Sequence, residues 1–190
     1  MNKPLAITMG DGAGIGPEII AKAFRDAPDL LRGCFVAGDL ATLRRAAAVV
    51  SEGGVSLPVA ELEQSAEALA APPRCVPVLQ VIEPRVPAPF GCISAQAGRA
   101  AGDCVVWAAR AALRGELAGL VTAPLHKEAL AAAGAPYDRY PGHTELLQAV
   151  AAEHLGVPVA RLPVRMMLAN DELRTVLVSI HVSLREATEQ

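Results

Sequence analysis

The chain has 190 residues, of which 52% are hydrophobic, 19% charged and 3% aromatic, and its formal net charge is −3. This composition excludes an intrinsically disordered chain, because disorder requires low apolar content and a high net charge. It also speaks against nucleic acid or an anionic membrane as the main partner, because 17 basic residues stand against 20 acidic ones without a basic block. A small molecule is the better expectation, bound by one large domain or slightly more.

The cysteines and the N-terminus indicate the cellular environment. The four cysteines form no C-x-x-C pair, which excludes zinc-ribbon and thioredoxin-like motifs and predicts reduced, mostly buried thiols. The apolar run before Gly10 is too short for the core of a signal peptide, and no run approaches the roughly 20 residues of a membrane span. We therefore expect a soluble, cytoplasmic protein without membrane contact.

The first fifty residues predict two successive strand–helix units. Residues 5–9 are apolar and lead into the glycine-rich turn 10–16, after which apolar residues recur at helical spacing, with Pro17 at the first helical position. Residues 34–37 predict a second strand and residues 40–50 a second helix. Two such units favour a parallel sheet covered by helices, and hence an α/β fold.

The middle of the chain alternates between an extended and a helical segment. Six of the 15 prolines lie within 72–89, which predicts an edge strand or an extended connection without a regular helix. Residues 94–116 predict a long helix, in which Gly98 and Gly102 would let another backbone approach closely. Residues 117–122 then predict a strand.

The last third predicts further helices and an antiparallel pair of strands. Helices are predicted over 124–133 and 144–155, and strands over 165–169 and 172–179, joined by a two-residue turn at Asn170-Asp171. The antiparallel pair indicates a second subdomain. We therefore expect a first α/β domain over 1–135 and the beginning of a second over 136–190.

A helix start lies very near the last residue. Ser183-Leu184-Arg185-Glu186 is a capping box, in which the serine side chain accepts from a free helix N–H and the glutamate reaches back to the cap. Only four residues follow it. Either this helix frays, or the sequence is the first part of a longer protein, and we expect the second.

Two candidate ligand sites follow predicted strands. The turn 10–16 would point backbone N–H groups at an anion, but it fits neither G-x-G-x-x-G nor the Walker pattern, and Asp11 opposes a phosphate there, so a closely packed turn is the simpler interpretation. Thr122, His126 and Lys127 follow a buried strand, where open α/β sheets bind ligands. The alternative is a solvated lysine and a histidine at a helix start.

Two further candidates are histidines. Residues 140–145 form a proline-glycine turn before a helix that Thr144 can cap, so His143 should be presented to bind a ligand oxygen or a metal. His181 ends an apolar strand, where an isolated histidine is more often a core or cap residue. No histidine pair has the spacing of a self-contained zinc site, so further ligands would come from missing sequence, a second subunit or carboxylates.

Taken together, four segments resemble the 4-hydroxythreonine-4-phosphate dehydrogenase family of pyridoxal phosphate biosynthesis. They are residues 7–18, 122–127, 140–145, and 166–169 with 180–181. The resemblance implies an isocitrate/isopropylmalate dehydrogenase-like fold of two α/β domains with the active site in the cleft, and a homodimer whose subunits share that site. It covers the N-terminal portion of a family member, and the C-terminal part is absent here.

The resemblance also implies roles for particular residues. His143 and Thr144 match the histidine and threonine that contact substrate, and His181 matches the first of three metal-binding histidines. The other two, and a lysine, an asparagine and an arginine that hold substrate, belong to the absent part. Gly12 stands where the family usually has proline. Lys127 is a weaker candidate for charge stabilisation, and no catalytic residue is assigned.

The activity implied is the oxidation of a phosphorylated hydroxy acid with NAD and a divalent metal ion (Zn, Mg or Co). The substrate would be 4-hydroxythreonine 4-phosphate, oxidised to a 3-keto acid that loses CO₂. The alternatives are a related dehydrogenase of threonate or erythronate 4-phosphate or of aromatic cis-diols, and a non-catalytic α/β binding module. The preference for NAD over NADP rests on the resemblance alone.

Overall fold

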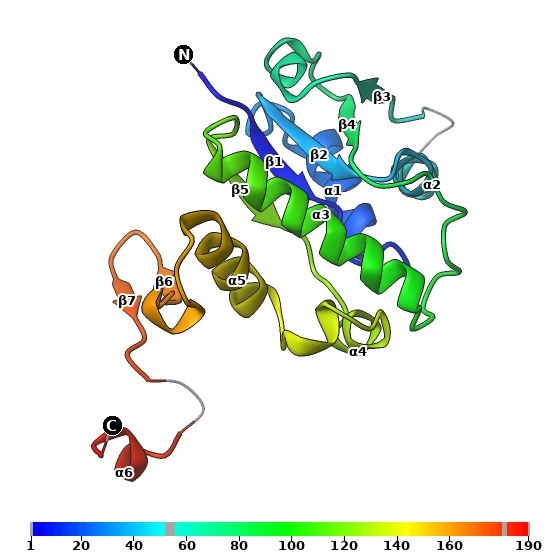
Figure 1. The fold of residues 1–190 in the computed structure, drawn as a ribbon. Coiled ribbons are helices and arrows are strands. Elements are labelled where there is room, and N and C mark those ends of the chain that lie inside the picture. Colours follow the sequence, from blue (N-terminus) through cyan, green and yellow to red (C-terminus); the bar gives the residue numbers. More distant parts are fainter. Residues whose placement is uncertain (1, 52–55, 180–181, 190) are drawn as a thin grey trace.

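The computed structural model describes residues 2–51, 56–179 and 182–189. Its centre is a five-stranded sheet in the order β3-β4-β2-β1-β5, in which every neighbouring pair is parallel (Figure 1). The strands are β1 (Leu5–Thr8), β2 (Cys34–Gly38), β3 (Val59–Leu62), β4 (Val76–Gln80) and β5 (Gly119–Thr122). The expected parallel, helix-covered α/β sheet is confirmed.

Helices cover both faces of this sheet. The helices α1 (Gly16–Asp26) and α2 (Leu40–Val50) lie on one face, and the long helix α3 (Ala95–Leu113) lies on the other (Figure 1). Successive residues of a strand point to opposite faces, so in β2 Val36 packs with Leu43 of α2, whereas Phe35 belongs to the cluster under α3. The Phe35 ring meets Trp107 of α3 edge-on, with ring centroids 6.3 Å apart. The core therefore has two layers.

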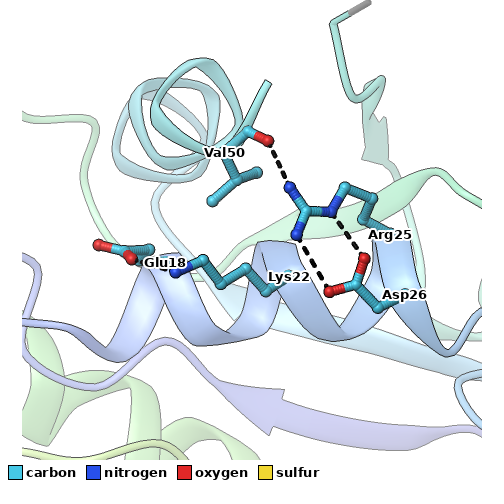
Figure 2. Close-up of polar contacts among 5 residues, drawn as sticks. All are labelled: Glu18, Lys22, Arg25, Asp26 and Val50. Atoms are coloured by element: carbon cyan, nitrogen blue, oxygen red, sulfur yellow. Dashed lines mark hydrogen bonds and ion pairs between the residues drawn. The ribbon is translucent and has the colours of Figure 1, made fainter. Parts of the chain in front are cut away.

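Polar contacts join the two helices of the first face. Figure 2 shows the Arg25 guanidinium at the end of α1, which donates to the Val50 carbonyl of α2 at 2.7 Å and to the Asp26 carboxylate at 2.7 Å. One turn earlier, Lys22 and Glu18 form an exposed ion pair at 2.6 Å. Such exposed pairs contribute little stability, so the buried face of α1 holds the helix in place.

The second half of the chain adds short elements. These are η1 (Ser65–Ala70) before β4, then α4 (Lys127–Ala132), η2 (Tyr137–Arg139), α5 (His143–Leu155), η3 (Val159–Arg161), β6 (Met167–Ala169), β7 (Arg174–Val176) and α6 (Leu184–Ala187). The helix α5 packs against α3, whereas the β6–β7 hairpin and α6 lie away from the five-stranded sheet (Figure 1). Every residue of β6 and β7 is exposed. The division at residue 136 stays a prediction.

The proline-rich segment contains an inner strand, so the prediction of an edge strand or extended connection was wrong. The strand β4 pairs with β3 on one side and with β2 on the other. The β2–β4 pairing begins at Val78, one residue after Pro77, so the missing N–H of the proline interrupts no bond of that ladder.

Three local predictions in the second half were also wrong. The hairpin has a four-residue connection, 170–173, because Ala169 pairs with Arg174. The Asn170 side chain accepts from the Leu173 amide at 2.6 Å and closes this turn. The helix predicted from residue 124 begins at Lys127. Thr144 caps no helix, because α5 has already begun at His143.

The capping box near the last residue is confirmed. The Glu186 amide donates to the Ser183 hydroxyl at 3.3 Å, and the Glu186 carboxylate accepts from the Ser183 amide at 3.0 Å. The helix that it starts, α6, is only one turn long.

None of the helices in the described ranges is long and apolar enough to cross a membrane.

Candidate functional site

Two of the segments singled out from the sequence lie against each other at the carboxyl edge of β1 and β5. The Asp11 amide donates to the Pro124 carbonyl at 2.9 Å. Gly10 has φ +69°, and a Cβ there would lie 2.4 Å from the Pro124 oxygen; at Gly16 it would lie 2.6 Å from the Met9 oxygen. Both glycines are thus required by close packing of backbones, which is the simpler interpretation considered for this turn.

The acidic residue of this glycine loop points inward. Asp11 is 6% exposed, and its Oδ1 accepts from the Ala13 amide at 2.9 Å. The Ala13 carbonyl in turn accepts from the Gly91 amide at 2.8 Å, in the connection between β4 and α3. Asp11 therefore shapes the loop, and its carboxylate is engaged within the protein.

Arg45 of α2 joins this loop to the same connection. Its Nη2 donates to the Gly12 carbonyl and its Nη1 to the Ala88 carbonyl, both at 2.7 Å. The guanidinium carbon lies 4.0 Å from the centroid of the Phe90 ring. Burial lowers the pKa of Arg45 from its ordinary value, although the side chain stays charged at neutral pH. No local pattern in the sequence predicted a role for Arg45.

Asp39 was also missed, and it organises the ends of β2 and β4. It is 2% exposed and caps α2: its Oδ2 accepts from the Thr42 amide at 2.8 Å and from the Thr42 hydroxyl at 2.7 Å. The Gln80 side chain donates to Asp39 Oδ1 at 3.2 Å and accepts from the Leu40 amide at 2.7 Å. An aspartate three residues before a threonine at a helix start was the available signal.

Among the residues after β5, one has a structural role and another is exposed. The His126 Nδ1 accepts from the Ala129 amide at 3.4 Å and caps α4, as the alternative interpretation predicted. Thr122 is half-buried and lies beside Thr8 of β1. The Lys127 side chain is exposed and has no polar partner within residues 2–51, 56–179 and 182–189. His126 is exposed as well, but its Nδ1 is engaged in the cap, so of the two exposed candidates Lys127 is the one without a polar contact in the described ranges.

His143 is the first residue of α5. The sequence predicted that the turn presents it to solvent, but the side chain is half-buried. Its Nε2 is buried and has no hydrogen-bond partner in the described part of the chain. Burial lowers the pKa of His143 below its ordinary value of 6.5, so the imidazole is neutral at pH 7. Thr144 follows it in the first turn of the helix and is also half-buried.

The predicted metal ligand, His181, lies outside the described residues. Among the described residues, no three His, Cys, Asp or Glu side chains gather closely enough to hold a metal ion. These residues do not by themselves make a metal site.

A groove that the sequence did not predict lies beside the segment that carries His143. It has a volume of about 980 Å³ and lies between α3, η2 and α5. Its apolar lining includes Trp107, Tyr140 and Val150, and an exposed ion pair at 3.0 Å joins Arg110 and Glu153 at its edge.

Comparisons with known proteins agree with the resemblance in the sequence. The family model described as "Pyridoxal phosphate biosynthetic protein PdxA" matches residues 31–190. The 4-hydroxythreonine-4-phosphate dehydrogenase of Beijerinckia indica is 44% identical, with 98% of this chain and 51% of the relative covered. The D-threonate 4-phosphate dehydrogenase of Salmonella typhimurium is 42% identical, with 97% and 52% covered.

Solved structures show the same relationship. The 4-hydroxythreonine-4-phosphate dehydrogenase of Klebsiella pneumoniae superposes with a TM-score of 0.79 at 34% identity, covering 99% of this chain and 54% of that one. A terephthalate 1,2-cis-dihydrodiol dehydrogenase of Burkholderia xenovorans, at 24% identity and a TM-score of 0.62, with 100% and 52% covered, shares the fold alone. The chain spans about half the length of the relatives it matches, corresponding to their N-terminal half. It belongs to the PdxA family of pyridoxal phosphate biosynthetic proteins.

Proposed function

We propose that the protein to which this chain belongs oxidises a 4-phosphorylated hydroxy acid, 4-hydroxythreonine 4-phosphate in the first place, with NAD and a divalent metal ion. The observation that carries the proposal is the family match over residues 31–190. The similar relatives are dehydrogenases, and their names specify 4-hydroxythreonine 4-phosphate or D-threonate 4-phosphate. An oxidoreductase acting on a small phosphorylated molecule is therefore the supported class.

The reaction removes a hydride and a proton from the C3 alcohol of the substrate. When bound, NAD⁺ would accept the hydride, and the 3-keto acid would lose its carboxylate as CO₂ while C2 takes up a proton. His143 and Thr144 orient the substrate in this proposal, and a neutral imidazole suits the role because it offers both a donor and an acceptor. The exposed Lys127 ammonium supplies positive charge for an anionic group of the substrate.

The remaining parts of the active site are proposed to come from outside this chain. His181 is one ligand of the divalent ion in this proposal, and a catalytic metal site needs further protein ligands. These would be supplied by the segment that corresponds to the C-terminal part of the relatives and by a second subunit, in a cytoplasmic homodimer with shared active sites. Light scattering of the full-length protein measures the oligomeric state directly.

The test uses the full-length protein encoded by the reading frame that contains these residues. NADH absorbance is followed with 4-hydroxythreonine 4-phosphate and with D-threonate 4-phosphate, with and without a chelator. We expect metal-dependent turnover and a large loss of kcat/KM in His143→Ala, while His154→Ala, an exposed histidine of the same helix, behaves as wild type. Absence of turnover with both compounds, or an unchanged kcat/KM in His143→Ala, contradicts the proposal or its site.

The metal assignment has its own test. If His181 is a ligand, His181→Ala loses bound metal and NADH production while its melting temperature stays near that of wild type, because the site needs the ligand and the sheet does not. If His181 is a core or cap residue, the variant keeps its metal and loses about 1–3 kcal/mol of stability. Metal content by mass spectrometry, with His154→Ala as the control, separates these outcomes.

D-threonate 4-phosphate is the second candidate, favoured by the 42% identity to the Salmonella typhimurium enzyme. The two compounds differ at C2, where one carries an ammonium group and the other a hydroxyl. The ratio of their kcat/KM values therefore reports which C2 group the site accepts.

A further inference from the structure

One face of α3 is shaped to receive the segment that leads to His143. A Cβ at Gly98 would lie 1.9 Å from the Ala129 carbonyl oxygen of α4, and one at Gly102 would lie 2.6 Å from the Tyr137 ring. No larger residue fits at either position without moving the neighbour. The close approach of another backbone is confirmed at Gly98, whereas at Gly102 the close neighbour is the Tyr137 side chain rather than a backbone. Both neighbours belong to the segment 127–140.

Two polar side chains of α3 hold the same segment. Arg99 Nη2 donates to the Ala133 carbonyl at 2.5 Å and to the Ala135 carbonyl at 3.0 Å, and its guanidinium carbon lies 5.6 Å from the Tyr137 ring centroid. The Tyr137 hydroxyl donates to Asp103 Oδ1 at 2.5 Å. Tyr137 is 4% exposed. Burial, together with the bond to Asp103, raises the pKa of Tyr137, so its hydroxyl remains a donor throughout the physiological range.

We propose that the Tyr137–Asp103 hydrogen bond is a latch that positions His143 and Thr144 for substrate, and that Tyr137 and Asp103 are therefore positioning residues. The inference rests on the proposed function. Tyr137 lies six residues before His143, and the Tyr140 amide donates back to the Tyr137 carbonyl at 3.1 Å, which turns the chain toward α5.

The first turn of α5 is thus held from both sides. Before it, Tyr137 is fixed to α3 by the latch. At its end and one turn later, Leu146 and Val150 belong to the same buried cluster as Val105 of α3. A shift of about 1 Å in a group that binds substrate costs up to roughly a hundredfold in rate, so fixing this turn has a direct consequence for the site.

Tyr140 provides a matched control. It lines the same groove as Tyr137 and lies three residues away, but its hydroxyl has no hydrogen-bond partner among the described residues. The change from tyrosine to phenylalanine therefore removes the latch at Tyr137 and no hydrogen bond at Tyr140.

The experiment measures binding of 4-hydroxythreonine 4-phosphate and D-threonate 4-phosphate to the full-length protein by calorimetry, with kcat and KM alongside. We expect Tyr137→Phe and Asp103→Ala each to raise Kd and KM about tenfold. The double variant should show no further loss of affinity, because each single change already removes the same hydrogen bond. Asp103→Asn should bind nearly as wild type, because its amide oxygen still accepts. Tyr140→Phe should also bind as wild type.

A second readout needs no substrate. The Leu146 amide donates to the Gly142 carbonyl at 3.3 Å, so its hydrogen exchange reports on the first turn of α5. Exchange at Leu146 should accelerate in Tyr137→Phe and stay unchanged in Tyr140→Phe. If wild type binds neither compound, the proposed function fails while this readout still tests the latch. Unchanged exchange at Leu146 in Tyr137→Phe overturns the latch. If wild type binds substrate, a Kd of Tyr137→Phe equal to that of wild type also overturns it.

Discussion

The closest approach between α3 and its neighbours gives the sharpest stability prediction, Gly98→Ala. In most helix interiors this change stabilises by about 0.5–1 kcal/mol, because alanine loses less backbone entropy on folding. Here the new Cβ would lie 1.9 Å from the Ala129 carbonyl oxygen, and a backbone atom cannot rotate away as a side chain can. A carbon–oxygen contact needs about 3.3 Å, so α3 and α4 must separate by roughly 1.4 Å.

The expected cost follows from that displacement. Overpacking a closely packed contact costs about 1–3 kcal/mol, and the rigid neighbour at Gly98 places this case at the upper end. After the gain in helix propensity, the net destabilisation is about 2 kcal/mol. For a chain of this size that corresponds to a melting temperature about 4–8 °C lower.

The assay is thermal and urea unfolding of wild type and variant, monitored by circular dichroism. Gly119→Ala is the control, because nothing lies within 4 Å of a Cβ there and its φ is ordinary. We expect the control to stay within about 0.5 kcal/mol of wild type. A Gly98→Ala variant as stable as wild type, or more stable, would refute the close approach of α3 and α4.

Two further predictions concern residues near the candidate site. Arg45→Met should lower the free energy of unfolding by about 1–3 kcal/mol, because the two carbonyls that accept from its guanidinium lose their donor. Limited proteolysis should also cut the connection between β4 and α3 faster in this variant. The control Arg44→Met, at an exposed neighbouring position, should show neither effect. Because burial lowers the pKa of His143 in the folded state, the unfolded state takes up the proton first as the pH falls below about 6.5. The His143 contribution to stability is therefore lost below that pH and present above it, and urea midpoints measured against pH should flatten in His143→Gln, whereas an unchanged slope would contradict the burial.

The fold was predictable where local patterns and topology agree. The strand–turn–helix unit around Pro17 and the helix with Gly98 and Gly102 are confirmed, because helical periodicity and small residues on one face are local signals. The strand β3, over Val59–Leu62, was missed because four residues of mixed polarity form a strand only through their pairing with β4. Pro77 misled for the same reason, since its place in the ladder depends on register with β2.

The site was predictable as a set of segments, not as a set of contacts. Parallel strands place the ends of β1 and β5 together, so the glycine loop and the segment after β5 meet as the strand rule implies. The roles of Arg45 and Tyr137 depend on partners 33 and 34 residues away, Gly12 and Asp103, and no local pattern specifies such pairs. Their detection required the three-dimensional structure.

Buried polar atoms without a hydrogen-bond partner indicate where a ligand would gain most binding free energy. In the described ranges, three buried side-chain atoms lack a hydrogen bond: Thr8 Oγ1, Arg45 Nε and His143 Nε2. Thr8 is wholly enclosed, and Arg45 is already bonded through both terminal nitrogens. Arg45 and His143 are both half-buried, but of these two only His143 makes no side-chain hydrogen bond in the described part of the chain. Because a buried polar atom without a partner is costly, a ligand that bonds to His143 Nε2 recovers that cost on binding, and substrate affinity should therefore depend more on His143 than on the exposed Lys127.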